Sequence, residues 1–192
     1  MAGNNGVGLV HVYTGTGKGK TTASLGLAMR ALGHGMSVCM IQFLKGGSYF
    51  GELFFAKKLP NFTILQFGDD CPWAEQMMRG EIECGVCRYC FSVYSEEKKR
   101  TMKAFEVAKS LASSDDYDML ILDEINVAMS RKLIPIESVL SLIDGKHPLL
   151  ELVLTGRNAP REIIERADIV TEMREIKHAF WKGTGSRKGR EY

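Results

Sequence analysis

Short apolar runs alternate with helically spaced apolar residues in the first part of the chain. Residues 9–13 form a short apolar run. After a glycine-rich turn, apolar residues recur at i, i+3, i+4 and i+7, which is one face of a helix: Leu25, Ala28, Met29 and Leu32. The sequence GHG at 33–35 ends that helix, and SVCMIQF at 37–43 predicts a buried strand. Strand, glycine-rich turn, helix and strand together predict the start of a parallel α/β sheet.

The same alternation continues to the C-terminal part of the chain. Further strands are predicted at 63–67, 119–124, 151–154 and 168–173, the last as a core strand, and helices after Ser95, at 135–145 and at 160–167. Five or six strands alternating with helices predict a mostly parallel, doubly wound sheet with helices on both faces. We expect residues 1–192 to form a single domain, with an insertion at about 68–94 that interrupts the alternation.

Composition narrows the range of partners. The chain has 192 residues, 45% of them hydrophobic and 25% charged, which matches an ordinary globular protein. A net charge of +2 is too small to indicate nucleic acid or a membrane as a partner. The sequence has no signal-peptide pattern and no apolar run of about 18 residues, so we expect a cytoplasmic protein. Its five cysteines are then not expected to form disulfides.

The sequence YTGTGKGKTT at 13–22 is typical of a phosphate-binding loop with one departure. The G-x-x-x-x-G-K-[ST] template has glycine at position 14, where this chain has Thr14. Glycines let backbone N–H groups turn toward a phosphate chain, and the next helix adds its positive N-terminus. A glycine-rich turn that merely contains lysines is the alternative. The expected nucleotide-binding residues are Gly15, Thr16, Gly17, Lys18, Gly19, Lys20, Thr21 and Thr22.

Polar residues follow two other predicted strands. Ligands of open parallel sheets bind at the carboxyl ends of the strands. Asp123 and Glu124 resemble a Walker B pair that holds Mg²⁺ directly or through water, with the Thr21 hydroxyl as a further ligand. Arg157 suits a phosphate contact, although it could also be an ordinary surface arginine. These residues predict a Mg-nucleotide site without distinguishing hydrolysis from group transfer.

Several motifs, in order from about residue 9 to the end, resemble one family, the ATP:corrinoid adenosyltransferases of the CobA type. They are YTGTGKGKTTASLGLAMRALGHG, IQFLKG, LILDEINVAM, VLTGRNAP and ADIVTEMREIKHAF. The resemblance implies a P-loop (RecA-like) fold and transfer of the 5′-deoxyadenosyl group of ATP to the cobalt(I) of a corrinoid, with release of triphosphate. It implies Lys20, Glu124 and Arg157 as catalytic residues. It also implies that Thr21 and Glu124 bind Mg²⁺ with support from Asp123.

The family resemblance also implies a corrinoid site and partners. Relatives displace the lower axial ligand of cobalt(II) with aromatic residues. Trp73 is the main candidate here, with Phe67 and Phe91 as weaker ones, and packing under the insertion is the alternative for Trp73. A homodimer is implied, and a flavoprotein or another reductase could supply electrons. Only about eight residues precede the first strand, so we expect the ATP site to be closed differently from that of longer relatives, for example by the partner subunit.

The cysteine-rich sequence CGVCRYC departs from the family pattern. Cys84, Cys87 and Cys90 have C-x-x-C-x-x-C spacing, and Cys71 lies 13 residues upstream of the first of them. Four thiolates suit zinc or an iron–sulfur cluster. Reduced free thiols are the alternative, and Cys71 is the weakest of the four ligand candidates. Cys39 lies within a predicted strand and is expected in the core.

Two other functions remain open from the sequence. One is a P-loop ATPase in which Glu124 activates water, and the other is a carrier that binds nucleotide and corrinoid and passes its ligand to a partner.

Overall fold

The structure is a computed structural model that describes residues 6–82 and 96–192. In these residues one or two helices separate each strand from the next, and the strands follow the order expected from the sequence. The elements are β1 (Val10–Thr14), α1 (Lys20–Gly33), β2 (Val38–Gln42), α2 (Gly51–Ala56), β3 (Phe62–Gln66), α3 (Ala74–Arg79), α4 (Glu97–Ala112), β4 (Met119–Asp123), α5 (Ile125–Ser130), α6 (Ile136–Asp144), β5 (Glu151–Thr155), α7 (Arg161–Arg166), β6 (Ile169–Glu172) and the 3-10 helix η2 (Ala179–Lys182).

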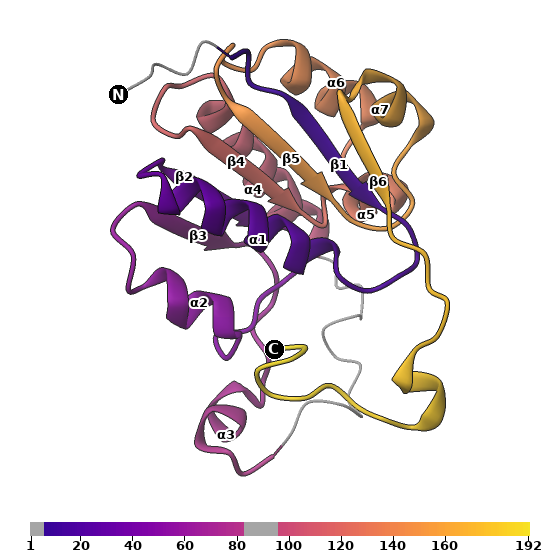
Figure 1. Cartoon of the computed structure of the whole chain (residues 1–192). Helices are drawn as coiled ribbons and strands as arrows, with labels where there is room; N and C mark the ends of the chain where they lie inside the picture. Colours follow the sequence, from indigo (N-terminus) through magenta and orange to yellow (C-terminus); the bar gives the residue numbers. More distant parts are fainter. Residues whose placement is uncertain (1–5, 83–95) are drawn as a thin grey trace.

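The described strands form one parallel sheet. Its order is β3-β2-β4-β5-β1-β6, and each neighbouring pair is parallel. The register places Gln42 opposite Asp123, and Tyr13 opposite Thr155. The carboxyl ends of β1, β2, β4 and β5 therefore meet at one edge of the sheet, where Figure 1 shows the loops that follow these strands.

Helices cover both faces of the sheet because alternate strand residues point to opposite sides. On one face, Ile41 and Leu122 belong to a core shared with α4, α5, α6 and α7. On the other face, Met40 and Ile121 belong to a core shared with α1 and α2. Figure 1 shows these two helical layers on either side of the strands. The predicted doubly wound α/β sheet is confirmed.

Two parts of the sequence prediction need correction. The strand at 168–173 was expected in the core, but β6 (Ile169–Glu172) is an edge strand paired with β1, and all four of its residues are exposed. An apolar run alone cannot distinguish a central strand from an edge strand. The sequence pattern also missed three of the four six-residue helices in the described residues, α2, α3 and α5. Helices of this length are too short to show helical periodicity, and the fourth, α7, was predicted because Pro160 marks its start.

The C-terminus folds back on the body of the protein. Tyr192 packs in a third apolar cluster with Tyr49 from the loop after β2 and with Cys71, Ala74 and Met77 around α3. The ring of Tyr192 meets that of Tyr49 edge to face, at a centroid distance of 5.3 Å. Within the part of the chain that the structure describes, no helix has the length and apolarity needed to cross a membrane.

Candidate nucleotide site

The glycine-rich loop between β1 and α1 is held against the end of β6. Gly15 and Gly19 have φ values of 96° and 110°, in the left-handed region that favours glycine. The N–H of Gly17 donates a hydrogen bond of 2.7 Å to the carbonyl of Met173. A Cβ atom on Gly15 would lie 2.4 Å from the same carbonyl oxygen, and one on Gly17 would lie 2.8 Å from it. The loop therefore requires glycine at these positions.

Thr14 has a structural role that glycine could not fill. It is the last residue of β1 and is buried. Its hydroxyl oxygen accepts a hydrogen bond of 3.2 Å from the N–H of Ala159. Thr14, the residue that departs from the phosphate-loop template, thus connects this loop to the loop that follows β5.

Lys20 lies folded over the phosphate loop. Its Nζ atom donates hydrogen bonds to the carbonyls of Gly15, at 2.9 Å, and Gly17, at 2.6 Å. Burial lowers the pKa of Lys20, the nearby Glu124 opposes this, and the positive charge of Arg157 lowers the pKa further, so that the net change is downward. The structure therefore brings Lys20, Glu124 and Arg157 into one electrostatic environment.

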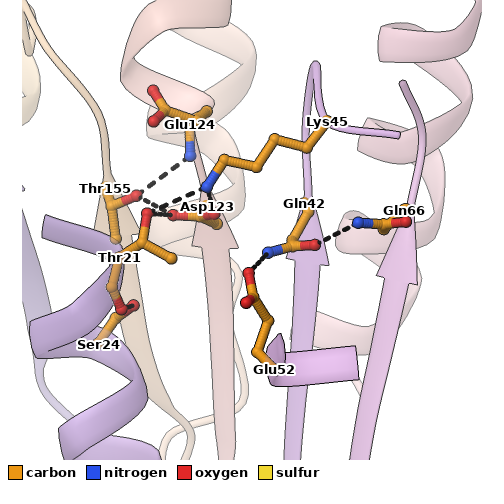
Figure 2. A network of polar contacts seen from close by, with 9 residues as sticks. All are labelled: Thr21, Ser24, Gln42, Lys45, Glu52, Gln66, Asp123, Glu124 and Thr155. Carbon is orange, nitrogen blue, oxygen red and sulfur yellow. Dashed lines mark hydrogen bonds and ion pairs between the residues drawn. The ribbon is translucent and has the colours of Figure 1, made fainter. Parts of the chain in front are cut away.

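A hydrogen-bond network links the phosphate loop to the ends of β4 and β5. Asp123 is fully buried. Its Oδ1 atom accepts hydrogen bonds from the hydroxyls of Thr21, at 2.9 Å, and Thr155, at 2.6 Å. The Thr155 hydroxyl in turn accepts one of 3.1 Å from the N–H of Glu124. Figure 2 shows these side chains converging from three elements. The predicted neighbours Thr21 and Asp123 therefore contact each other, 102 residues apart in the sequence.

Lys45 completes this network, and the sequence interpretation missed it. Its Nζ atom donates to Asp123 Oδ2 at 2.6 Å and to the Thr21 hydroxyl at 3.1 Å. Burial would raise the pKa of Asp123, but the Lys45 ammonium together with the hydroxyl donors Thr155 and Thr21 outweighs burial and holds that pKa below its usual value. The motif IQFLKG places Lys45 just after a predicted strand, so the strand-end argument applied to Asp123 could have found it.

Glu124 directly follows Asp123 at the end of β4, and Arg157 lies in the loop after β5. Glu124 has a φ of 67° and precedes α5. Burial raises the pKa of Glu124, and Lys45 opposes that effect. A Cβ atom on Gly156 would lie 3.3 Å from a carboxylate oxygen of Glu124, so the carboxylate faces the loop that carries the exposed Arg157.

A second polar chain lies at the end of β2. Gln42 is fully buried, and its amide nitrogen donates to Glu52 at 3.1 Å. Its amide oxygen accepts from Gln66 at 2.8 Å. Figure 2 shows this chain beside Lys45. The sequence analysis did not find it, because each contact depends on strand register and on the short helix α2.

The remaining predicted nucleotide-binding residues that carry side chains, Thr16, Lys18 and Thr22, are exposed. Lys18 Nζ donates to a carboxylate oxygen of Glu191 at 2.6 Å. The C-terminal segment therefore contacts the phosphate loop.

Only some of the candidate corrinoid-contacting and cysteine residues lie within the described part of the chain. Trp73 directly precedes α3 and is 46% exposed, whereas Phe67 packs against the larger core. Cys39 is buried within β2, as predicted, and burial raises the pKa of its thiol to about 12. Cys71 is also buried. The remaining candidates Cys84, Cys87, Cys90 and Phe91 lie outside the described residues.

Comparisons with known proteins agree with the sequence resemblance. The family model described as "ATP:corrinoid adenosyltransferase BtuR/CobO/CobP" matches residues 6–192. A corrinoid adenosyltransferase of Pseudomonas aeruginosa is 33% identical over 96% of this chain and 84% of its own length. Corrinoid adenosyltransferases of a Sinorhizobium species and of Escherichia coli K12 are 36% and 32% identical over 96% of this chain, and over 80% and 86% of their own lengths.

The matched region includes the phosphate loop, the strand ends and the residues that join them. The chain therefore belongs to the ATP:corrinoid adenosyltransferase family, and it is an enzyme of that class.

Proposed function

We propose that this chain uses the site at the carboxyl edge of its sheet to transfer the 5′-deoxyadenosyl group of ATP to the cobalt(I) of a corrinoid, releasing triphosphate. One observation carries the proposal. In a chain of this family, Lys20, the phosphate loop and the Thr21–Asp123 hydrogen bond of 2.9 Å gather at a single edge of the sheet. A site of that composition suits the stabilisation of a departing polyphosphate.

The proposed reaction explains why the site is rich in groups that bind anions. Cobalt(I) supplies the electron pair for the new bond to C5′ of ATP. The bond between C5′ and its oxygen breaks, and its electron pair leaves with the triphosphate. Backbone N–H groups of residues 15–19 and the Lys20 ammonium would neutralise the charge that develops on that leaving group. Arg157 would contact the phosphates from the loop after β5.

Oxygen donors at the same edge fit a magnesium ion. Mg²⁺ prefers carboxylate, hydroxyl and phosphate oxygens. The Thr21 hydroxyl and the Asp123 carboxylate are 2.9 Å apart, and the ammonium of Lys45 contacts both of them, as a cation would. Thr21, Asp123 and Glu124 would hold the ion. When bound, Mg²⁺ would supply positive charge to the phosphates.

The corrinoid would be contacted by the segment that begins at Trp73. Trp73 is 46% exposed, so a ligand can reach it. We further propose a cytoplasmic homodimer of single-domain chains. A flavoprotein or another reductase would reduce the cobalt of the bound corrinoid.

Zinc or an iron–sulfur cluster at Cys71, Cys84, Cys87 and Cys90 stays a hypothesis that rests on the spacing of these cysteines. Elemental analysis and an absorption spectrum of anaerobically purified protein would decide it, and absence of both zinc and iron would reject it.

One assay separates the proposal from its two rivals. The protein is supplied with MgATP and cobalamin under strong reductant, and the corrinoid spectrum and the phosphate product are followed together. Adenosylcobalamin with triphosphate supports transfer. ADP with phosphate supports a hydrolase that uses Glu124, and binding without turnover supports a carrier.

A substitution pair connects the reaction to the site. Lys20→Ala is expected to abolish adenosyl transfer, because the buried ammonium at the loop is lost. Lys58→Ala removes an exposed lysine after α2 and is the control. Near-normal transfer by Lys20→Ala would reject the role of this loop.

A further inference from the structure

Lys45 stands between the two oxygens that we assign to magnesium. Its Nζ atom lies 2.6 Å from Asp123 Oδ2 and 3.1 Å from Thr21 Oγ1 (Figure 2). The hydroxyl hydrogen of Thr21 is donated to the other oxygen of Asp123, so Lys45 faces the lone pairs of Thr21 Oγ1. A metal ion needs those same lone pairs. The ammonium and a divalent cation therefore compete for Thr21.

The fold holds the backbone of Lys45 in this place. The N–H of Phe43 donates to the carbonyl of Asp123 at 2.9 Å, which joins the end of β2 to β4. Leu44 follows with a φ of 59°, in the left-handed region that costs energy for a residue with a side chain. The carbonyl of Lys45 then accepts a hydrogen bond of 2.8 Å from Gly68. These contacts aim the side chain of Lys45 at Asp123.

The buried carboxylate explains why a cation is required there. Asp123 has an exposed fraction of 0%, and a buried, ionised carboxylate without a partner is strongly unfavourable. The Lys45 ammonium forms an ion pair of 2.6 Å with this carboxylate and neutralises it.

We propose that Lys45 is the resident counter-ion of the nucleotide site: it holds Thr21 and Asp123 together before nucleotide arrives and is displaced from Thr21 by the divalent cation. Lys45 is thus a positioning residue whose competition sets the affinity of the site for its metal. This inference rests on the proposed magnesium role of Thr21 and Asp123.

The test is a Mn²⁺ titration of nucleotide-free protein, followed by the electron paramagnetic resonance signal of free Mn²⁺. Lys45→Gln keeps a hydrogen-bond donor to Asp123 but removes the charge, and it is expected to bind Mn²⁺ about tenfold more tightly than the unmodified protein, ~1.4 kcal/mol. Lys146→Gln is the matched control. Lys146 is a partly buried lysine bonded to the carbonyls of Gly8 and Leu150, at the amino ends of β1 and β5, and its loss should leave Mn²⁺ affinity unchanged.

Two results would overturn the inference. Equal, measurable affinity in the unmodified protein and Lys45→Gln would reject the competition while leaving the magnesium site intact. Absence of Mn²⁺ binding in both would reject the inference together with the metal role of Thr21 and Asp123.

A second measurement does not depend on whether the Lys45→Gln protein folds. In protein labelled with ¹³C at lysine Cε, the resonance of Lys45, assigned by its loss in Lys45→Arg, should shift as Mg²⁺ is added. The resonance of Lys146 should not shift. An unchanged Lys45 resonance at a Mg²⁺ concentration that saturates the site would contradict the displacement.

Discussion

Thr155→Val is the substitution whose effect follows most directly from the structure. The two side chains have nearly the same shape, and Thr155 is fully buried, so packing changes little. What is lost is a hydroxyl that donates to Asp123 Oδ1 at 2.6 Å and accepts from the N–H of Glu124 at 3.1 Å. The substitution therefore tests the network rather than the core.

The magnitude can be worked out from these two bonds. A hydrogen bond to a charged group contributes about 1.5–3 kcal/mol, and leaving a buried N–H unpaired costs about 1–3 kcal/mol. Partial relaxation of the Glu124 backbone would recover some of this. We therefore expect Thr155→Val to lower the free energy of unfolding by about 3 kcal/mol. In a domain of this size, that corresponds to a decrease in Tm of roughly 6–12 °C.

Urea denaturation followed by circular dichroism measures the effect. Thr155→Ser is the control, because it keeps the hydroxyl and loses one methyl group, for which we expect about 1 kcal/mol. A Thr155→Val protein as stable as Thr155→Ser would show that the hydroxyl does not support Asp123, and it would refute the network as drawn.

The pH dependence of the Thr155→Val effect gives a second check. The pKa of Asp123 is lowered in the folded protein. Burial would raise it, but the ion pair with Lys45 and the two hydroxyl donors together outweigh burial. A group of this kind stabilises the fold above its unfolded pKa of about 3.9, and the contribution is lost as pH falls through the lower folded pKa. The difference between Thr155→Val and the unmodified protein should thus be full at pH 7 and decrease only below about pH 4. A difference that already disappears at pH 6 would contradict this.

Three other predictions address the loop, the corrinoid site and the core. Gly17→Ala should weaken ATP binding by more than about tenfold in calorimetry, because its Cβ would lie 2.8 Å from the backbone after β6, whereas Gly26→Ala, with nothing within 4 Å, should bind normally. Trp73→Ala should slow cobalt(II) reduction in the MgATP-bound enzyme while Trp181→Ala, which removes a 75% exposed indole, should not, and equal rates would reject the aromatic role. Cys39, whose thiol pKa is raised to about 12 by burial, should resist iodoacetamide at pH 8 in the folded protein, as judged by mass spectrometry, and become labelled in urea.

Much of the sheet could be predicted because its strands are short, apolar and parallel. Runs such as MLILD at 119–123 are buried on both faces, and their continuous apolar character reflects that burial directly. The position of Asp123 at a strand end then followed from the topology. The same signal failed for β6, since an apolar run is compatible with an exposed edge as well as with the core.

The contacts that complete the site could not be predicted, because they join residues distant in the sequence. Thr21 and Asp123 are 102 residues apart, and Lys18 and Glu191 are 173 residues apart. No local period encodes such pairs. Lys45 depends in addition on the left-handed conformation of Leu44, which propensity does not favour for a leucine.

Thr14 shows how a departure from a motif can be read once the fold is known. A glycine at this position would satisfy the phosphate-loop template, yet it would leave the N–H of Ala159 without the hydroxyl that now accepts its hydrogen bond at 3.2 Å. Ala159 lies two residues after Arg157, so this bond ties the loop that would hold the triphosphate to the loop that would contact it from the other side. The requirement for left-handed backbone is met by Gly15 instead, with a φ of 96°. The shift of the glycine to position 15 therefore does not weaken the phosphate loop, because Thr14 links two of the four strand ends that form the nucleotide site, those of β1 and β5.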